Sequence, residues 1–135
     1  MRFVNDSKAT NIEAALRAIQ SFVPGLVVVL GGRFKGGDFA DLRDALVARS
    51  ASVVAIGEAA PLIRQALAPA VAVHDAADMV AAVRTAFALA SPGETVVLAP
   101  ACASFDMFRD YAERGRVFKR EVARLQDEWI GTLEQ

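Results

Sequence analysis

An α/β fold is the class that the sequence predicts, with a parallel sheet covered by helices on both faces. Short apolar runs rich in β-branched residues alternate with Ala-rich stretches in which apolar residues recur at helical spacing. Several runs are apolar at consecutive positions, as strands are when helices cover both faces of a sheet. The 135 residues have the length of one ordinary domain, and 54% of them are hydrophobic against 23% charged. We therefore expect a single folded domain.

Five segments are predicted to be strands and five to be helices. The strands are expected at residues 3–4, 26–30, 52–56, 71–73 and 95–98. The helices are expected at residues 11–22, 41–48, 61–68, 75–90 and 105–133, the last one broken at Gly115. Proline and glycine mark the boundaries: Pro24-Gly25 ends the first helix, Pro61 suits a first helical turn, and Pro92-Gly93 precedes the last strand.

The composition argues against several classes of function. Fifteen Lys and Arg against sixteen Asp and Glu leave a formal charge of −1, so no overall attraction to nucleic acid or anionic lipid is expected. One Cys and one His are too few for a zinc site or an internal disulfide. No apolar run exceeds five residues, whereas a membrane span needs about twenty, and no signal peptide pattern opens the chain. We expect a cytoplasmic protein that binds neither nucleic acid nor membrane.

Three polar segments follow predicted strands, and in an open parallel sheet such loops meet at the carboxyl edge, where ligands bind. The first segment, residues 5–11, offers a carboxylate, an ammonium group and two hydroxyls. These groups could position a charged ligand. Alternatively, Asp6, Ser7 or Thr10 simply caps the helix that follows.

The second segment, residues 30–39, contains four glycines together with Arg33 and Lys35. Glycines permit positive φ angles and let a ligand approach the backbone, and the two cations could bind a carboxylate or a phosphate. The segment matches neither a Walker A loop nor the dinucleotide-binding fingerprint. It is therefore either an anion-binding loop or a turn that requires unusual backbone angles.

The third segment, residues 98–106, leads into the last predicted helix, and Ser104 is either the N-cap of that helix or a ligand donor. Cys102 has no second cysteine and no histidine nearby in the sequence, which favours a packed thiol over a nucleophile. The basic residues farther along are interpreted as a solvated helix face: Arg114, Arg116, Lys119, Arg120 and Arg124.

Taken together, the three segments resemble the C-terminal domain of the Mur ligases, a family of ATP-dependent peptidoglycan enzymes. The resemblance rests on residues 4–11, on Leu30-Gly31-Gly32 with Lys35-Gly36 and Asp38-Phe39, and on residues 100–104 with Asp106, Phe108, Arg114-Gly115 and Phe118. It extends from residue 2 to about residue 125, and it is closest to the branch that joins D-glutamate to UDP-N-acetylmuramoyl-L-alanine. It implies a Rossmann-like three-layer domain, with a mostly parallel sheet of six strands and helices on both faces.

The resemblance also implies roles for individual residues. Those implied to contact D-glutamate are Thr10, Lys35, Ser104, Phe105 and Tyr111, and those implied to face ATP are Asp6 and Lys8. Lys35 and Thr10 would hold the α-carboxylate, whereas Ser104 and the Tyr111 backbone would receive the side-chain carboxylate. No residue is implied to be a catalytic acid or base or a metal ligand, so the expected contribution is to position the amine of D-glutamate.

Residues 1–135 are accordingly expected to be the third domain of a three-domain ligase, separated from the other two. The sequence holds neither a Walker A loop nor a sugar-binding domain, so ATP, Mg²⁺ and the UDP-sugar acceptor would be held mainly by the absent domains, and the chain alone would be inactive. Arg33-Phe34 departs from the acidic residue that the family commonly places beside the lysine. The alternative function is a stand-alone binding module, in which this pair redirects the pocket to another small anion or to a protein partner.

Overall fold

The protein is a three-layer α/β domain in a computed structural model that describes residues 1–134. The central sheet has five strands in the order β1 (Arg2–Asn5), β5 (Thr95–Leu98), β2 (Leu26–Gly31), β3 (Ser52–Ile56) and β4 (Ala72–Asp75). All four neighbouring pairs are parallel. The expected parallel sheet is thus confirmed, and every loop that follows a strand leaves from the same edge.

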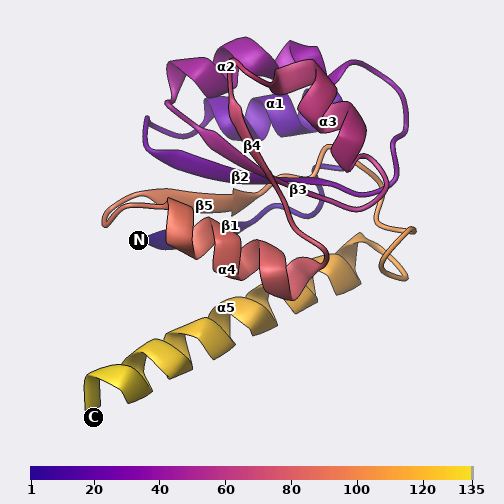
Figure 1. Cartoon of the computed structure of the whole chain (residues 1–135). Helices are drawn as coiled ribbons and strands as arrows, with labels where there is room; N and C mark the ends of the chain where they lie inside the picture. The colour runs from indigo at the N-terminus through magenta and orange to yellow at the C-terminus, as the bar shows by residue number, and fades with distance from the viewer. Residues whose placement is uncertain (135) are drawn as a thin grey trace.

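Helices cover both faces of the sheet, as expected. They are α1 (Ile12–Gln20), the short 3-10 helix η1 (Phe39–Leu42), α2 (Arg43–Ala48), α3 (Ala60–Leu67), α4 (Met79–Leu89) and α5 (Tyr111–Glu134). In Figure 1, α1, α2 and α3 lie on one face of the sheet, and α4 and α5 lie on the other.

The apolar core is divided between the two faces of the sheet, and β2 shows how. Leu26, Val28 and Leu30 pack into the cluster under α1, α2 and α3, whereas Val27 and Val29 pack into the cluster under α4 and α5. Successive side chains of a strand point to opposite faces, so both sets are buried only if both faces are covered. The run of consecutive apolar residues in the sequence is explained by this packing.

The implied sixth strand is wrong for the residues that the structure describes, where the sheet has five. After β5, residues 99–110 form turns rather than a strand, and their one ladder contact is an isolated antiparallel bridge between Arg33 and Ala103. The chain then enters α5. The segment that follows β5 is therefore used as a loop at the carboxyl edge of the sheet.

Two expectations about the last helix are also corrected. It begins at Tyr111 rather than at residue 105, and it continues through Gly115 without a break. A Cβ at Gly115 would lie 2.7 Å from Nδ2 of Asn5, so this glycine lets the end of β1 approach the helix. The glycine serves close packing here, not helix termination.

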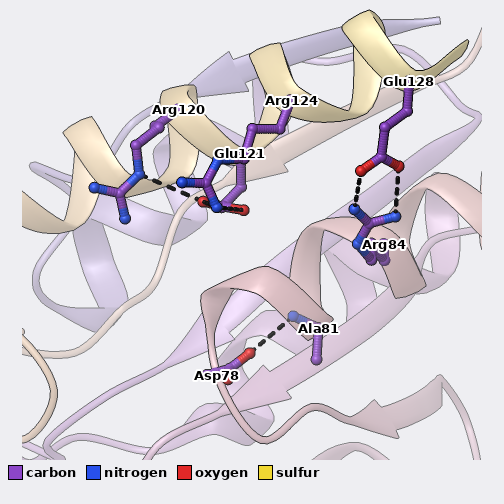
Figure 2. Close-up of polar contacts among 7 residues, drawn as sticks. All are labelled: Asp78, Ala81, Arg84, Arg120, Glu121, Arg124 and Glu128. Atoms are coloured by element: carbon purple, nitrogen blue, oxygen red, sulfur yellow. Dashed lines mark hydrogen bonds and ion pairs between the residues drawn. The ribbon is translucent and has the colours of Figure 1, made fainter. Parts of the chain in front are cut away.

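One pair of charged side chains joins α5 to α4, as Figure 2 shows. Arg84 on α4 donates to both carboxylate oxygens of Glu128 on α5, at 3.0 and 2.7 Å. Within α5, the buried carboxylate of Glu121 contacts Arg120 at 3.4 Å and Arg124 at 3.3 Å. Arg120 and Arg124 are nevertheless exposed, as the sequence predicted for that helix face.

Candidate functional site

Backbone hydrogen bonds hold the three polar loops together at the carboxyl edge of the sheet. The loop after β1 (residues 6–11) is bonded to the loop after β5 (residues 99–110) through Ala101 N to Ala9 O, at 2.8 Å. The loop after β2 (residues 32–38) is bonded to the loop after β5 through Arg33 N to Ala103 O, at 2.9 Å, and through Ala103 N to Arg33 O, at 3.0 Å. The expected convergence of the three loops on one edge is therefore seen.

The cap of α1 differs from the alternatives that the sequence left open. Asn11, not Asp6, Ser7 or Thr10, accepts the hydrogen bond from Ala14 N, at 2.8 Å. Because Asn11 performs the capping, the polar side chains of residues 6–10 are not needed to start the helix. Thr10 is half-buried directly before this cap.

The glycines of the second loop adopt the backbone conformations that the sequence predicted. Gly31 and Gly32 have φ angles of 133° and 131°, and a Cβ at Gly32 would collide with the carbonyl oxygen of Ala103. A Cβ at Gly37 would lie 3.0 Å from Cγ1 of Ile12, so this loop also passes close to the start of α1. The unusual backbone angles expected of a turn are thus present, and the loop that carries Lys35 lies beside the segment that carries Thr10.

The two residues that depart from the family pattern are engaged by the chain itself. The Arg33 guanidinium lies 3.5 Å from the carboxylate of Glu58, and the Phe34 ring packs on Phe39 with ring centroids 5.2 Å apart. Lys35, next to them, is exposed and makes no hydrogen bond or ion pair with the described part of the chain. Its ammonium group is therefore left available to an anion.

The third loop places Ser104, Phe105 and Tyr111 in different environments. Ser104 is buried, and its carbonyl accepts from Met107 N and Phe108 N, at 3.1 and 2.8 Å. It does not cap α5, because Glu113 N donates instead to the Asp110 side chain, at 2.7 Å. Phe105 is 63% exposed and Tyr111 is 44% exposed.

Of the two polar backbone groups of Tyr111, only the carbonyl makes a hydrogen bond with the described residues. Its carbonyl accepts from Ser7 Oγ at 2.6 Å. Its N–H group, at the first position of α5, makes no hydrogen bond with the described residues. Free N–H groups at a helix N-terminus carry partial positive charge, so this one can donate to a carboxylate.

Asp6 and Lys8 line a pocket of about 500 Å³ between the loop after β1 and the start of α5. The α5 wall contributes Tyr111, Arg116 and Lys119. Three cations and one carboxylate leave the lining positively charged, which suits an anionic ligand.

Arg114 is the functional candidate that the sequence analysis placed wrongly. It is 1% exposed rather than solvated, and its guanidinium donates to Ser7 Oγ, Ser7 O and Cys102 O at 2.9, 2.8 and 2.9 Å. Burial lowers the pKa of Arg114 to about 10, so the group remains a cation at neutral pH. A signal for its burial was present, because Arg114 precedes Phe118 by four residues and so shares its helix face.

Cys102 and Asp106 are also fixed in the third loop. Cys102 is fully buried, and desolvation raises the pKa of its thiol to about 12, which makes it a packed thiol and not a nucleophile. Asp106 Oδ2 accepts from Glu58 N at 3.0 Å, which joins this loop to the one after β3. Its Oδ1 is buried and has no hydrogen-bond partner among the described residues.

The described residues form neither a metal-binding cluster nor a membrane-spanning helix. Within residues 1–134, no three or more His, Cys, Asp or Glu side chains are grouped so that they could hold a metal ion. No helix in the same range is both long enough and apolar enough to cross a membrane.

The chain is similar in sequence to a known protein family and to several of its members. Residues 1–102 match the family model described as Mur ligase, glutamate ligase domain. The chain is 50% identical over 124 residues to the UDP-N-acetylmuramoylalanine--D-glutamate ligase of Solibacter usitatus, covering 92% of this chain and 28% of that protein. The same enzyme of Aromatoleum aromaticum is 47% identical over 128 residues, and that of Desulfotalea psychrophila 43% over 127, each covering 94% of this chain and 28% of the relative. The chain thus spans little more than a quarter of the length of these relatives.

Proposed function

The chain belongs to the glutamate ligase domain family of the Mur ligases, and from this membership we propose that it binds D-glutamate for an ATP-dependent, amide-forming ligase. In the complete enzyme, D-glutamate would be joined to UDP-N-acetylmuramoyl-L-alanine in peptidoglycan biosynthesis. The domain would act in the cytoplasm, hold the amino acid and close over the nucleotide. It would be inactive alone, because the phosphate-binding loop and the acceptor site belong to other domains.

The observation that carries this proposal is the set of unused donors on three joined loops. The Lys35 ammonium and the Tyr111 N–H have no partner among the described residues, and Thr10 is not needed as a cap. A dicarboxylate requires donors at two separated points. In the proposed arrangement, Lys35 and Thr10 hold the α-carboxylate, and Ser104 and Tyr111 N hold the other carboxylate beside the exposed Phe105.

The pocket beside Asp6 and Lys8 fits the proposed contact with ATP. Its lining joins cations to one carboxylate, and these groups suit the phosphates and the ribose hydroxyls of a nucleotide, respectively. ATP would supply the phosphoryl group that activates the acceptor carboxylate. The contribution of this chain is to orient the amine of D-glutamate and exclude water, while Mg²⁺ would be held by the other domains.

A stand-alone module with a redirected pocket has less support. That alternative was based on Arg33 and Phe34, whose side chains contact Glu58 and Phe39. The pocket of about 350 Å³ that Phe34 and Phe39 line contains the carboxylate of Asp38 and no cation among the described residues, so it does not suit a small anion.

The test is a chimeric ligase, in which this chain replaces the matching 124 residues of the Solibacter usitatus relative. We expect ADP release that requires both D-glutamate and UDP-N-acetylmuramoyl-L-alanine, and none with L-glutamate. The isolated chain should release no ADP under the same conditions. A folded chimera that lacks D-glutamate-dependent turnover would refute the proposal, and it would favour a module with another ligand.

A further inference from the structure

Arg114 hydrogen-bonds two of the three loops of the site from a single position on α5 and lies beside the start of the third. Its Nε and Nη2 donate to Ser7 in the loop after β1, and its Nη1 donates to the carbonyl of Cys102 in the loop after β5. A Cβ at Gly32, where the second loop begins, would lie 3.3 Å from Nη1 of Arg114. A side chain at Gly32 would therefore crowd the guanidinium.

Ser7 links the guanidinium of Arg114 to the backbone of Tyr111, the first residue of α5. Its hydroxyl accepts from Arg114 Nε at 2.9 Å and donates to the carbonyl of Tyr111 at 2.6 Å. Both Ser7 and Arg114 are at least 98% buried, at 2% and 1% exposure. A hydrogen-bonded cation in such surroundings is costly to disturb, because its polar partners would be left without donors.

The charge of Arg114 is not neutralised by an ion pair in the described part of the chain. Its fork of donors is used on two carbonyls and one hydroxyl. Lysine could not reproduce this geometry, because an ammonium group is a single point with no planar fork. The three hydrogen bonds therefore require the planar guanidinium, and a positive charge alone would not form them.

We infer that Arg114, acting through Ser7, is a positioning residue that sets the relative placement of the three loops that bind D-glutamate. The inference rests on the proposed function and adds a residue that contacts neither substrate nor nucleotide. Thr10 and Lys8 lie within three residues of Ser7, Ser104 lies two residues after Cys102, and Lys35 lies three residues after Gly32. A shift of Arg114 therefore moves each group of substrate donors relative to the others.

The test uses three variants of the chimeric ligase: Arg114→Lys, Ser7→Ala and the two substitutions together. Each variant is assayed under conditions in which circular dichroism shows that it is folded. We expect kcat/KM for D-glutamate to fall roughly 10- to 100-fold with Arg114→Lys, because misplacement by about 1 Å can reduce rates 100-fold. KM for D-glutamate should rise, while KM for the UDP-sugar acceptor stays within twofold. The double variant should lose less than the product of the single losses, because the two side chains share a hydrogen bond that either substitution removes.

Arg84→Gln is the matched control. It removes the bidentate contact of α4 with α5 at Glu128, so it weakens the same helix without touching the loops. A purely structural role of Arg114 would reduce the active fraction, and hence kcat, without changing any KM. A folded Arg114→Lys chimera that behaves as Arg84→Gln does, or that keeps its KM for D-glutamate, would overturn the inference.

A second measurement separates this inference from the proposed function. Amide NMR spectra of the 135-residue chain with Arg114→Lys or Ser7→Ala should show shifts at Lys8, Arg33 and Ser104, whereas Arg84→Gln leaves these amides unchanged. If the unsubstituted chimera is inactive but these shifts occur, the proposed function fails and the coupling of the loops stands. If the chimera is active and the shifts are confined to α5, the inference fails alone.

Discussion

Lys35 is the residue on which the proposed recognition of an anion depends most directly. Its side chain is exposed and makes no contact with an acid of the described chain, so Lys35→Ala should leave the melting temperature unchanged. Loss of a charged donor to a carboxylate should raise KM for D-glutamate about 10- to 100-fold in the chimera, equivalent to roughly 1.5–3 kcal/mol.

The control for this substitution is Arg17→Ala, which also removes one exposed cation. Arg17 lies in the last turn of α1 and pairs with Glu13, away from the three loops. Its KM for D-glutamate should match that of the unsubstituted chimera. Equal effects of the two substitutions would indicate a general electrostatic influence and remove Lys35 from the site.

Cys102 gives a second prediction at the scale of one residue. Its thiol has a pKa of about 12, whereas an unperturbed thiol titrates near 9, because burial disfavours the thiolate. At pH 9 the folded chain should therefore react with iodoacetamide at least about 100-fold more slowly than the chain in denaturant, since only the thiolate reacts. Mass spectrometry of alkylated protein over time measures both rates. Comparable rates would mean that the loop after β5 opens readily.

At the scale of elements, the start of α5 separates the two interpretations of Ser104. Asp110 accepts from Glu113 N, so Asp110→Ala should reduce the free energy of unfolding by about 1 kcal/mol, the usual effect of losing an N-cap. Ser104→Ala should change it less, while it raises KM for D-glutamate. Urea unfolding of both variants measures the two free energies. A larger loss of stability for Ser104→Ala than for Asp110→Ala would indicate that Ser104 has a structural role.

The strands were predictable because each is marked by a short run of apolar, mostly β-branched residues that are adjacent in the sequence. The expected strand at residues 52–56 is the observed β3, and the one at 26–30 extends by only one residue, to Gly31. Element boundaries at the site were less predictable, because they depend on contacts distant in sequence. Residues 105–110 have helical spacing, yet α5 starts only at the Asp110 cap, and Gly115 permits packing against Asn5.

The site was predictable to a similar extent and for the same reason. Parallel strands bring the loops that follow them to one edge, so the meeting of the three loops follows from the strand pattern alone. The burial of Arg114 does not follow from its charge, because buried arginines are rare. Its helical spacing from Phe118 and Leu125 indicates a shared inward face, and this periodicity outweighs the basic residues around it.

At the scale of the whole molecule, the two apolar clusters lie on opposite faces of one sheet and are connected through its strands. Val28 belongs to one cluster and its neighbours Val27 and Val29 to the other, so neither cluster can unfold without exposing residues of the same strand. The chain should therefore unfold in one cooperative transition, even though it spans only 28% of the relatives it matches.

Trp129 makes this prediction measurable. It lies on α5, with its ring centroid 6.2 Å from that of Phe87 on α4, so its fluorescence reports the layer on one side of the sheet. Far-UV circular dichroism reports the helices of both layers. We expect the two signals to give the same urea midpoint and the same slope. A fluorescence midpoint below that of circular dichroism would mean that the α4–α5 layer detaches from the sheet first. In that case the Arg114 contacts would have to form again each time α5 docks, which would make placement of the D-glutamate loops depend on docking of that helix.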